Sequence, residues 1–121
     1  MNKSIANWID RILDGEIPDN VIAFCFNLYE ESEGEWSMEI VGTEDFDPED
    51  EDWACEEVTD FGSRDDLYRW KMDCDWEEAF EYMIEELSQY LESGKHAKLL
   101  KSTDGVGVGF VDGDLEILYM K

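Results

Sequence analysis

The stretch DWEEAFEYMIEELSQYLES, from Asp75 to Ser93, decides how the rest of the chain is organised. Its apolar residues recur at steps of three and one, which places them on one face of an α-helix about 28 Å long. Asp75 is suited to cap the start of this helix, with Glu78 as its capping-box partner, and Gly94 is suited to end it in a left-handed conformation. The apolar face needs a sheet to cover, and it consists of Trp76, Ala79, Phe80, Met83, Ile84, Leu87, Tyr90 and Leu91.

The opposite face of the predicted helix is acidic, as is the chain as a whole. The 121 residues include 33 acids and 9 bases, which gives a formal net charge of -24. High charge is one signature of disorder, but 43% hydrophobic and 13% aromatic residues are enough to build a core. We therefore predict a single folded domain over residues 1–121.

The first third of the chain predicts one helix and a pair of strands. Ser4 to Asp14 has the apolar spacing of a short amphipathic helix. Residues 20–30, NVIAFCFNLYE, are apolar in both alternating sets, which predicts a central strand covered on both faces. After a hairpin loop, residues 35–41, EWSMEIV, predict a half-buried antiparallel strand with Ser37 and Glu39 on its polar face.

The remaining segments predict further strands. Residues 53–59, WACEEVT, and residues 67–72, LYRWKM, are interpreted as extended. Residues 105–120, GVGVGFVDGDLEILYM, have the strongest hairpin pattern, with a tight turn at Asp112–Gly113. One face of the first strand of this hairpin is bare, so we expect a helix to pack closely against its glycines, Gly105, Gly107 and Gly109.

These elements follow the order α-β-β-β-α-β-β, with short connections between successive strands. The order predicts an α+β fold in which two main helices pack on a mostly antiparallel sheet of about five strands. The strand that is apolar on both sides indicates either helices on both faces or a contact with a second copy. We therefore expect a monomer or a weak dimer.

The acidic excess restricts the partners of the protein. Contacts with phosphates need Lys and Arg, so we expect no nucleic acid partner, and an anionic membrane surface is disfavoured for the same reason. No signal peptide or stretch of transmembrane length is recognisable, so we expect a cytoplasmic protein. Because self-repulsion opposes folding, a chain of this charge is expected to live at high salt, bind cations or meet a basic partner.

The acidic segment GTEDFDPEDEDWACEEV, residues 42–58, is densest in acids from Glu44 to Asp52, and no Lys or Arg occurs between Ile12 and Ser63. Carboxylates within a Debye length of about 8 Å act as one field, which speeds encounter with a cationic protein. The aromatic residues beside them are of the type enriched at binding hot spots. We predict a partner-binding surface formed by Glu44, Asp45, Phe46, Asp47, Glu49, Asp50, Glu51, Asp52, Trp53, Glu56 and Glu57.

Two other interpretations of the acidic segment stay open. It can serve solubility alone, as a solvated loop and charged sheet edge in an acidic regulatory or structural interaction domain or in a halophilic protein. It can also bind Ca²⁺, because Glu56 supplies the acid at the twelfth position of an EF-hand loop counted from Asp45. The sixth position of that loop should be glycine, but here it is Asp50.

The sequence carries no pattern typical of catalysis or of a metal centre. His96 is the only histidine and lies among lysines. Three cysteines are scattered without a CxxC pair, as is typical of reduced and mostly buried thiols: Cys25, Cys55 and Cys74. The GVGVG stretch leads into a hairpin, not into a phosphate-binding helix. We therefore expect neither an enzyme nor a bound cofactor.

Three segments together carry a family resemblance: the acidic stretch 26–58, the helix EEAFEYMIEELSQYL at 77–91, and the closing hairpin GVGVGFVDGDLEILY at 105–119. In this build the chain resembles the small cytoplasmic immunity proteins of bacterial polymorphic toxin systems, including contact-dependent growth inhibition. The resemblance implies a non-enzymatic inhibitor that binds a cognate toxin domain, often a basic nuclease, and blocks its active site or substrate path. It assigns a role to no individual residue.

Overall fold

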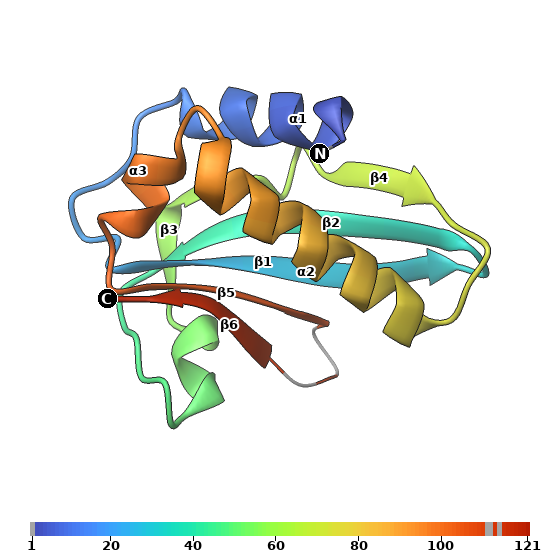
Figure 1. Ribbon diagram of the computed structural model, residues 1–121. Coiled ribbons are helices and arrows are strands. Elements are labelled where there is room, and N and C mark those ends of the chain that lie inside the picture. Colours follow the sequence, from blue (N-terminus) through green and yellow to red (C-terminus); the bar gives the residue numbers. More distant parts are fainter. Residues whose placement is uncertain (1, 111–112, 114) are drawn as a thin grey trace.

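A six-stranded sheet forms the middle layer of the protein (Figure 1). The computed structural model describes residues 2–110, 113 and 115–121, without the side chains of residues 59 and 60. Along the sheet the order is β3-β2-β1-β5-β6, and β4 also pairs with β2. The strands are β1 (Ala23–Ser32), β2 (Glu35–Thr43), β3 (Glu57–Gly62), β4 (Tyr68–Lys71), β5 (Gly105–Phe110) and β6 (Leu115–Met120).

The α+β prediction is confirmed, and the sheet is mostly antiparallel. β1 and β2 form the expected hairpin, with Gly34 at a positive φ of 75° in the turn. The exception to antiparallel pairing is β1 with β5, which run parallel because the chain passes through β3, β4 and the helices between them. The outer edge of β2 is shared between β3 and β4. The turn predicted at Asp112–Gly113 includes residue 112, which lies outside the described residues.

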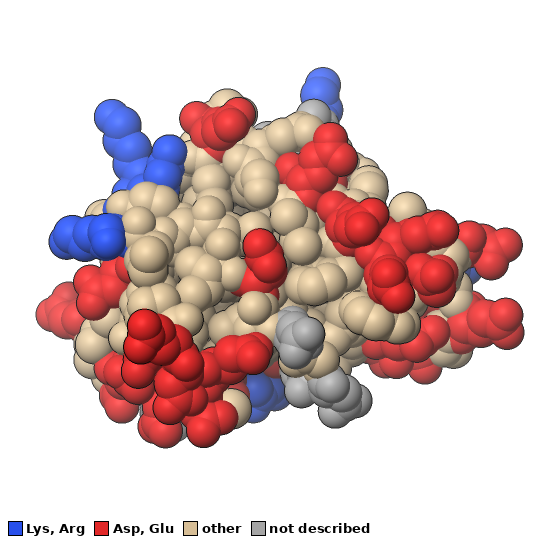
Figure 2. Space-filling model, turned by 60° about the horizontal axis from the view of Figure 1, so that its bottom comes forward, with Lys and Arg blue, Asp and Glu red and all other residues tan. Residues whose placement is uncertain are grey.

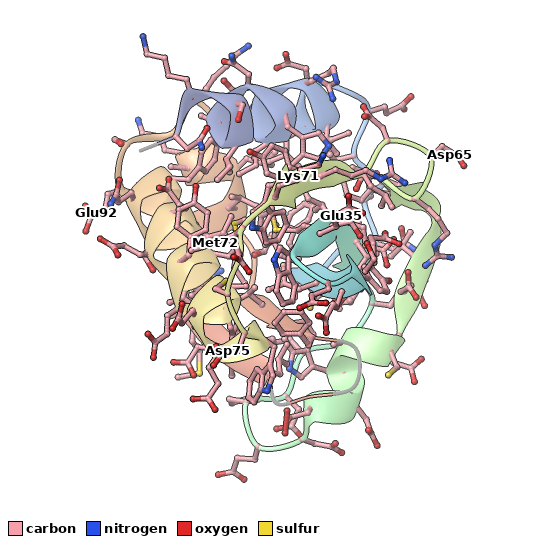
Figure 3. The ribbon with its side chains drawn as sticks, turned by 90° about the vertical axis from the view of Figure 1, so that its right-hand side faces the viewer. Glu35, Asp65, Lys71, Met72, Asp75 and Glu92 are labelled. Carbon is pink, nitrogen blue, oxygen red and sulfur yellow. The ribbon has the colours of Figure 1, made fainter. Side chains whose placement is uncertain are left out.

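The helices α1 (Lys3–Leu13), α2 (Trp76–Ser93) and α3 (Ala97–Lys101) contribute to one core on one face of the sheet. Figure 3 views the molecule from one end and shows α2 on one side of the sheet. The core beneath the helices includes Phe24, Phe26 and Leu28 from β1, which are buried at alternate positions. The predicted helix at the centre of the fold is therefore confirmed, and so is the sheet beneath it.

The cap predicted at the start of α2 is confirmed, whereas the end of the helix differs from the prediction. Asp75 caps the start, and its carboxylate accepts a hydrogen bond from the Glu78 N–H at 3.0 Å. Gly94 is extended, with φ at -69°, so the left-handed cap is wrong. Glycine fits there for another reason: a Cβ would overlap the ring of Tyr90. Trp76 is 53% exposed because the first turn of α2 contacts Phe110 at the end of β5 from one side only.

The second face of β1 is covered by the short 3₁₀ helix η1 (Glu51–Cys55) and the loop before it. Trp53 from η1 packs in a small core with Ala23, Cys25 and Val41. The close packing expected over the β5 glycines is confirmed, but the partner is not an α-helix. A Cβ on Gly105 would overlap the ring of Phe46, and one on Gly107 would lie 3.1 Å from Trp53. β1 is therefore a central strand covered on both faces, as its sequence predicts.

Two strand predictions need correction. Residues 53–55 belong to η1, so the third strand begins only at Glu57. β2 is not half-buried: every residue after Glu35 is buried, including Ser37 and Glu39. Their side chains are covered because Glu31 accepts a hydrogen bond from Ser37, and polar residues of neighbouring elements surround Glu39.

We expect Gly105→Ala to lower the free energy of unfolding by about 1–3 kcal/mol, because the new methyl group must displace the ring of Phe46. Urea unfolding is the measurement. The matched control is Gly62→Ala, whose Cβ would meet its nearest atom at an ordinary 3.7 Å. In a Phe46→Ala background the same Gly105→Ala change should cost little, and an equal cost in both backgrounds would contradict the proposed clash.

Candidate protein-binding site

The predicted acidic surface is exposed and lies around η1 on the side of the sheet away from the helices. All of its carboxylate residues are solvent-exposed. Figure 2 shows them as one dense group at the lower left, where η1 and its preceding loop lie. A second acidic group lies at the right, where the β1–β2 hairpin and the start of α2 lie, and Lys and Arg stand toward the edges of this view.

Short-range hydrogen bonds fix the shape of the acidic segment. The Asp47 carboxylate accepts from the Glu49 N–H at 2.9 Å, and the Asp50 carboxylate accepts from the Asp52 N–H at 3.0 Å. The second contact caps η1. In the described part of the chain, no group of three or more His, Cys, Asp or Glu side chains is placed to hold a metal ion. The Asp47 and Asp50 carboxylates thus bind backbone N–H groups, which gives no support to the calcium interpretation.

The charge of the acidic segment is not neutralised within the molecule. Among the described residues, the ion pairs involve none of the carboxylates from Glu44 to Glu56. Glu57 is the exception in the predicted surface, because it pairs with Arg64 at 3.0 Å. The carboxylates therefore present a common negative field to any cation that approaches.

The two aromatic residues of the predicted surface are not free anchors. Trp53 is only 1% exposed, and Phe46 is half-buried against it, with ring centroids 4.8 Å apart in an edge-to-face arrangement. Both rings pack on the glycine face of β5. The partner contact of Trp53 stays a prediction, and its apolar surface covers the protein's own sheet in this structure.

The structure adds a hollow that the sequence analysis missed, beside η1 on the same side of the sheet. Its volume is about 430 Å³. Its walls come from β1, β2, η1, β3 and the ends of β5 and β6. The lining includes Asn27, Tyr29, Glu39, Glu51, Asp52, Glu57 and Arg64. Exposed carboxylates of the acidic segment thus form part of the wall of a concave site.

Glu39 lies in the wall of this hollow and is 1% exposed. Its Oε1 accepts a short hydrogen bond from the hydroxyl of Tyr29 and a longer one, at 3.3 Å, from the side-chain amide of Asn27. Its Oε2 lies 3.4 Å from the Nε of Arg64. Arg64 is 70% exposed and reaches Glu57 with its terminal nitrogen. A buried carboxylate is thus held by two neutral donors and one exposed cation.

The surroundings of Glu39 shift the titration of two neighbours. Burial raises the pKa of Tyr29, and the hydrogen bond to Glu39 raises it further. Burial also raises the pKa of the Cys25 thiol to about 12, with a smaller contribution from the charge of Glu39. Both groups are therefore neutral at physiological pH. The Cys25 thiol donates to Asn27 at 3.3 Å, so it belongs to the same polar cluster.

A signal for this cluster is present in the sequence. The positions of β1 that share a face with Cys25 change from apolar to polar at Asn27 and Tyr29. Asn27 is directly opposite Glu39 in the β1–β2 register. A polar run on an otherwise buried face indicates a buried network, but only the hairpin register shows that its members meet.

The histidine of the chain lies away from the hollow, whereas Cys55 is part of its lining. His96 contacts Asp14 at 2.7 Å, and Lys95 pairs with the same carboxylate at 3.0 Å. These two neighbours lower the pKa of Asp14, with Lys95 the larger cause. Cys25 is buried, Cys55 is exposed, and all three cysteines are free.

No protein-family model, curated protein or solved structure matches the chain. None of the helices in the described residues combines the length and apolar character needed to span a membrane. The site must therefore be interpreted from its own geometry and charge.

We expect Arg64→Gln to lower the free energy of unfolding by about 1–2 kcal/mol, because it leaves the buried Glu39 carboxylate without a cation. This is the lower part of the range for an unsatisfied buried group, since Tyr29 and Asn27 still donate to the carboxylate. The double variant Glu39→Gln/Arg64→Gln should recover most of the loss in urea unfolding.

The matched control for this pair is Arg11→Gln, which breaks the Arg11–Asp66 ion pair between two exposed side chains. Its effect should be much smaller than that of Arg64→Gln. Equal effects of the two substitutions would show that Glu39 does not depend on Arg64.

We expect stability to fall as the pH rises from about 9 toward 12, because the pKa of Cys25 is about 12 when folded and 9 as its ordinary value. A group with a raised folded pKa contributes its full stability below the unfolded pKa and loses it above. Unfolding free energies measured from pH 8 to 10.5 should show a slope approaching about 1.4 kcal/mol per pH unit from this thiol. Cys25→Ala should reduce the slope, and exposed Cys55→Ala should not.

Proposed function

We propose that this protein is a non-enzymatic inhibitor of the immunity type, which binds and neutralises a basic toxin domain through its acidic surface. The observation that carries the proposal is the set of exposed carboxylates around η1 that have no cationic partner among the described residues. The family resemblance of the sequence supplies the class of partner. The proposed site of action is the cytoplasm.

The acidic segment suits this role because it resembles a run of phosphates. A nuclease-like domain binds phosphates with Lys and Arg, and carboxylates held on a fixed backbone can occupy the same positions. Fixed charges steer the encounter and select a complementary partner more than they add affinity. Because η1 is capped and packed through Trp53, little conformational entropy remains to be lost on binding.

Affinity also needs apolar contact, and exposed Trp76 supplies a candidate anchor in place of Trp53. Its ring lies 6.2 Å from that of Phe110 in an edge-to-face arrangement. Phe110 also lines the hollow, so aromatic surface adjoins the acidic wall. An exposed tryptophan beside a concave charged site is typical of a binding hot spot.

The direct test is a rescue experiment. The C-terminal domain encoded by the gene immediately upstream in the source genome is expressed in a bacterium, with and without this protein. We expect the domain to stop growth, and the protein to restore growth and to co-purify with the domain. If a toxic, basic domain forms no complex, the proposed pairing is wrong. Binding without any protection from toxicity would instead favour a regulatory interaction domain.

Charge substitutions test whether the acidic segment makes the contact. Changing Asp45, Asp47, Asp50 and Asp52 to Asn should slow association with the basic domain at least tenfold at low salt, because the steering field is lost. Stopped-flow kinetics measure this rate. The matched control changes four exposed acids of α2 on the other side of the sheet, Glu77, Glu81, Glu85 and Glu92, to Gln. Equal slowing by both variants would show that only net charge matters.

A further inference from the structure

We propose that the hollow beside η1 is the receptor for a single arginine side chain of the basic partner, with Glu39 as the carboxylate that binds its guanidinium. This inference rests on the proposed function, because it names where a basic partner is held most specifically. It concerns the buried part of the site, which the exposed charges around η1 do not include.

The volume and charge of the hollow fit one cationic side chain. About 430 Å³ lies within the range of about 300–1,000 Å³ for small-ligand pockets. Of the residues that the structure describes, four carboxylates line it against one cation, Arg64: Glu39, Glu51, Asp52 and Glu57. The opposing neutral groups on Asn27 and Tyr29 donate to Glu39 and so hold its carboxylate in one orientation. The lining therefore has a negative net charge, which favours binding of a further positive group.

Arg64 already places a guanidinium at Glu39, but the contact between the two groups is long. The Nε of Arg64 is 3.4 Å from Glu39, whereas charge-assisted hydrogen bonds are typically about 2.7–2.9 Å long. The terminal nitrogen of Arg64 is engaged at 3.0 Å by Glu57 instead. Arg64 lies on the connection between β3 and β4 and is 70% exposed, so it can leave without disturbing the core.

An incoming arginine can make the contact that Arg64 does not. Its guanidinium can donate directly to Oε2 of Glu39, the oxygen that Tyr29 and Asn27 leave free, and its planar array of donors fixes the direction of that bond as the ammonium of lysine does not. The arginine would replace Arg64 at Glu39, while Glu51 and Asp52 at the wall lie beside its charge. Arg64 then competes with the partner for the site and reduces its affinity for any cation that fits less well.

The probe for this site is N-acetyl-arginine amide, followed by two-dimensional NMR of the labelled protein. We expect saturable shifts of the Asn27 side-chain amide, the Tyr29 backbone and the Arg64 Nε–H signals. The neutral analogue N-acetyl-citrulline amide, which has the same shape, should produce no such shifts. An equal response to both probes, or shifts confined to residues 44–50, would overturn the inference.

Two substitutions sharpen the test. Arg64→Gln removes the competing guanidinium and should tighten binding of the arginine probe about tenfold, whereas Glu39→Gln should weaken it at least tenfold. The matched control is Glu81→Gln, which makes the same charge change as Glu39→Gln on an exposed residue of α2 that lies outside both the hollow and the acidic surface. Unchanged affinity in Arg64→Gln would overturn the inference even if Glu39→Gln failed to fold.

The outcome is separable from that of the proposed function. If the protein rescues growth and binds its basic partner, but its hollow does not bind the arginine probe, the proposed function stands and the receptor site is wrong. Arginine binding in the hollow without rescue would leave the site in place and remove the toxin as its partner.

Discussion

The burial of both faces of β1 is the constraint on which the rest of the structure depends. Its first four residues, 23–26, are apolar on both sides, so neither face there can be left in water without losing the free energy of burial. The three helices cover one face, and the chain must supply a second cover for the other. That cover is formed by Phe46 and Trp53, and it fits because Gly105 and Gly107 leave room beside β1. Because Phe46 and Trp53 pack on this face of the sheet, they hold the acidic segment beside it.

This arrangement explains how so many carboxylates are tolerated in one short segment. The acids are interrupted by two aromatic residues, Phe46 and Trp53, whose rings pack against the sheet while the charges remain in water. Repulsion between the carboxylates opposes the turn into η1, and it is offset by the burial of Trp53 and by the Asp50 cap. The same packing that completes the core therefore fixes the geometry of the negative surface.

The parts of the fold that follow from local periodicity could be predicted from the sequence. The spacing in α2 and the two-sided apolar run in β1 each indicate one structure, and both are present. The parallel pairing of β1 with β5 could not be predicted, because it depends on how distant segments come together. The glycines of β5 indicated close packing, but hydrophobic pattern alone does not distinguish a helix from the ring of Trp53. For the same reason the sequence predicts a partner contact for Trp53, whereas its ring covers the protein's own sheet.

The exposed part of the candidate site could also be predicted, because carboxylates in a polar loop stay in water, whereas the buried part could not. Alternation in β2 predicts that Glu39 faces solvent, and only the register with Asn27 and the approach of Arg64 reverse that expectation. A buried carboxylate contributes nothing to solubility. Replacing a buried ion pair by apolar residues of similar volume often leaves the stability of a protein unchanged or raises it. Solubility therefore does not account for Glu39. A carboxylate oriented by Tyr29 and Asn27 at a concave surface has the arrangement of a recognition group. Under the proposed function, the exposed acids would bring a basic partner to the surface, and Glu39 would distinguish which basic partner fits.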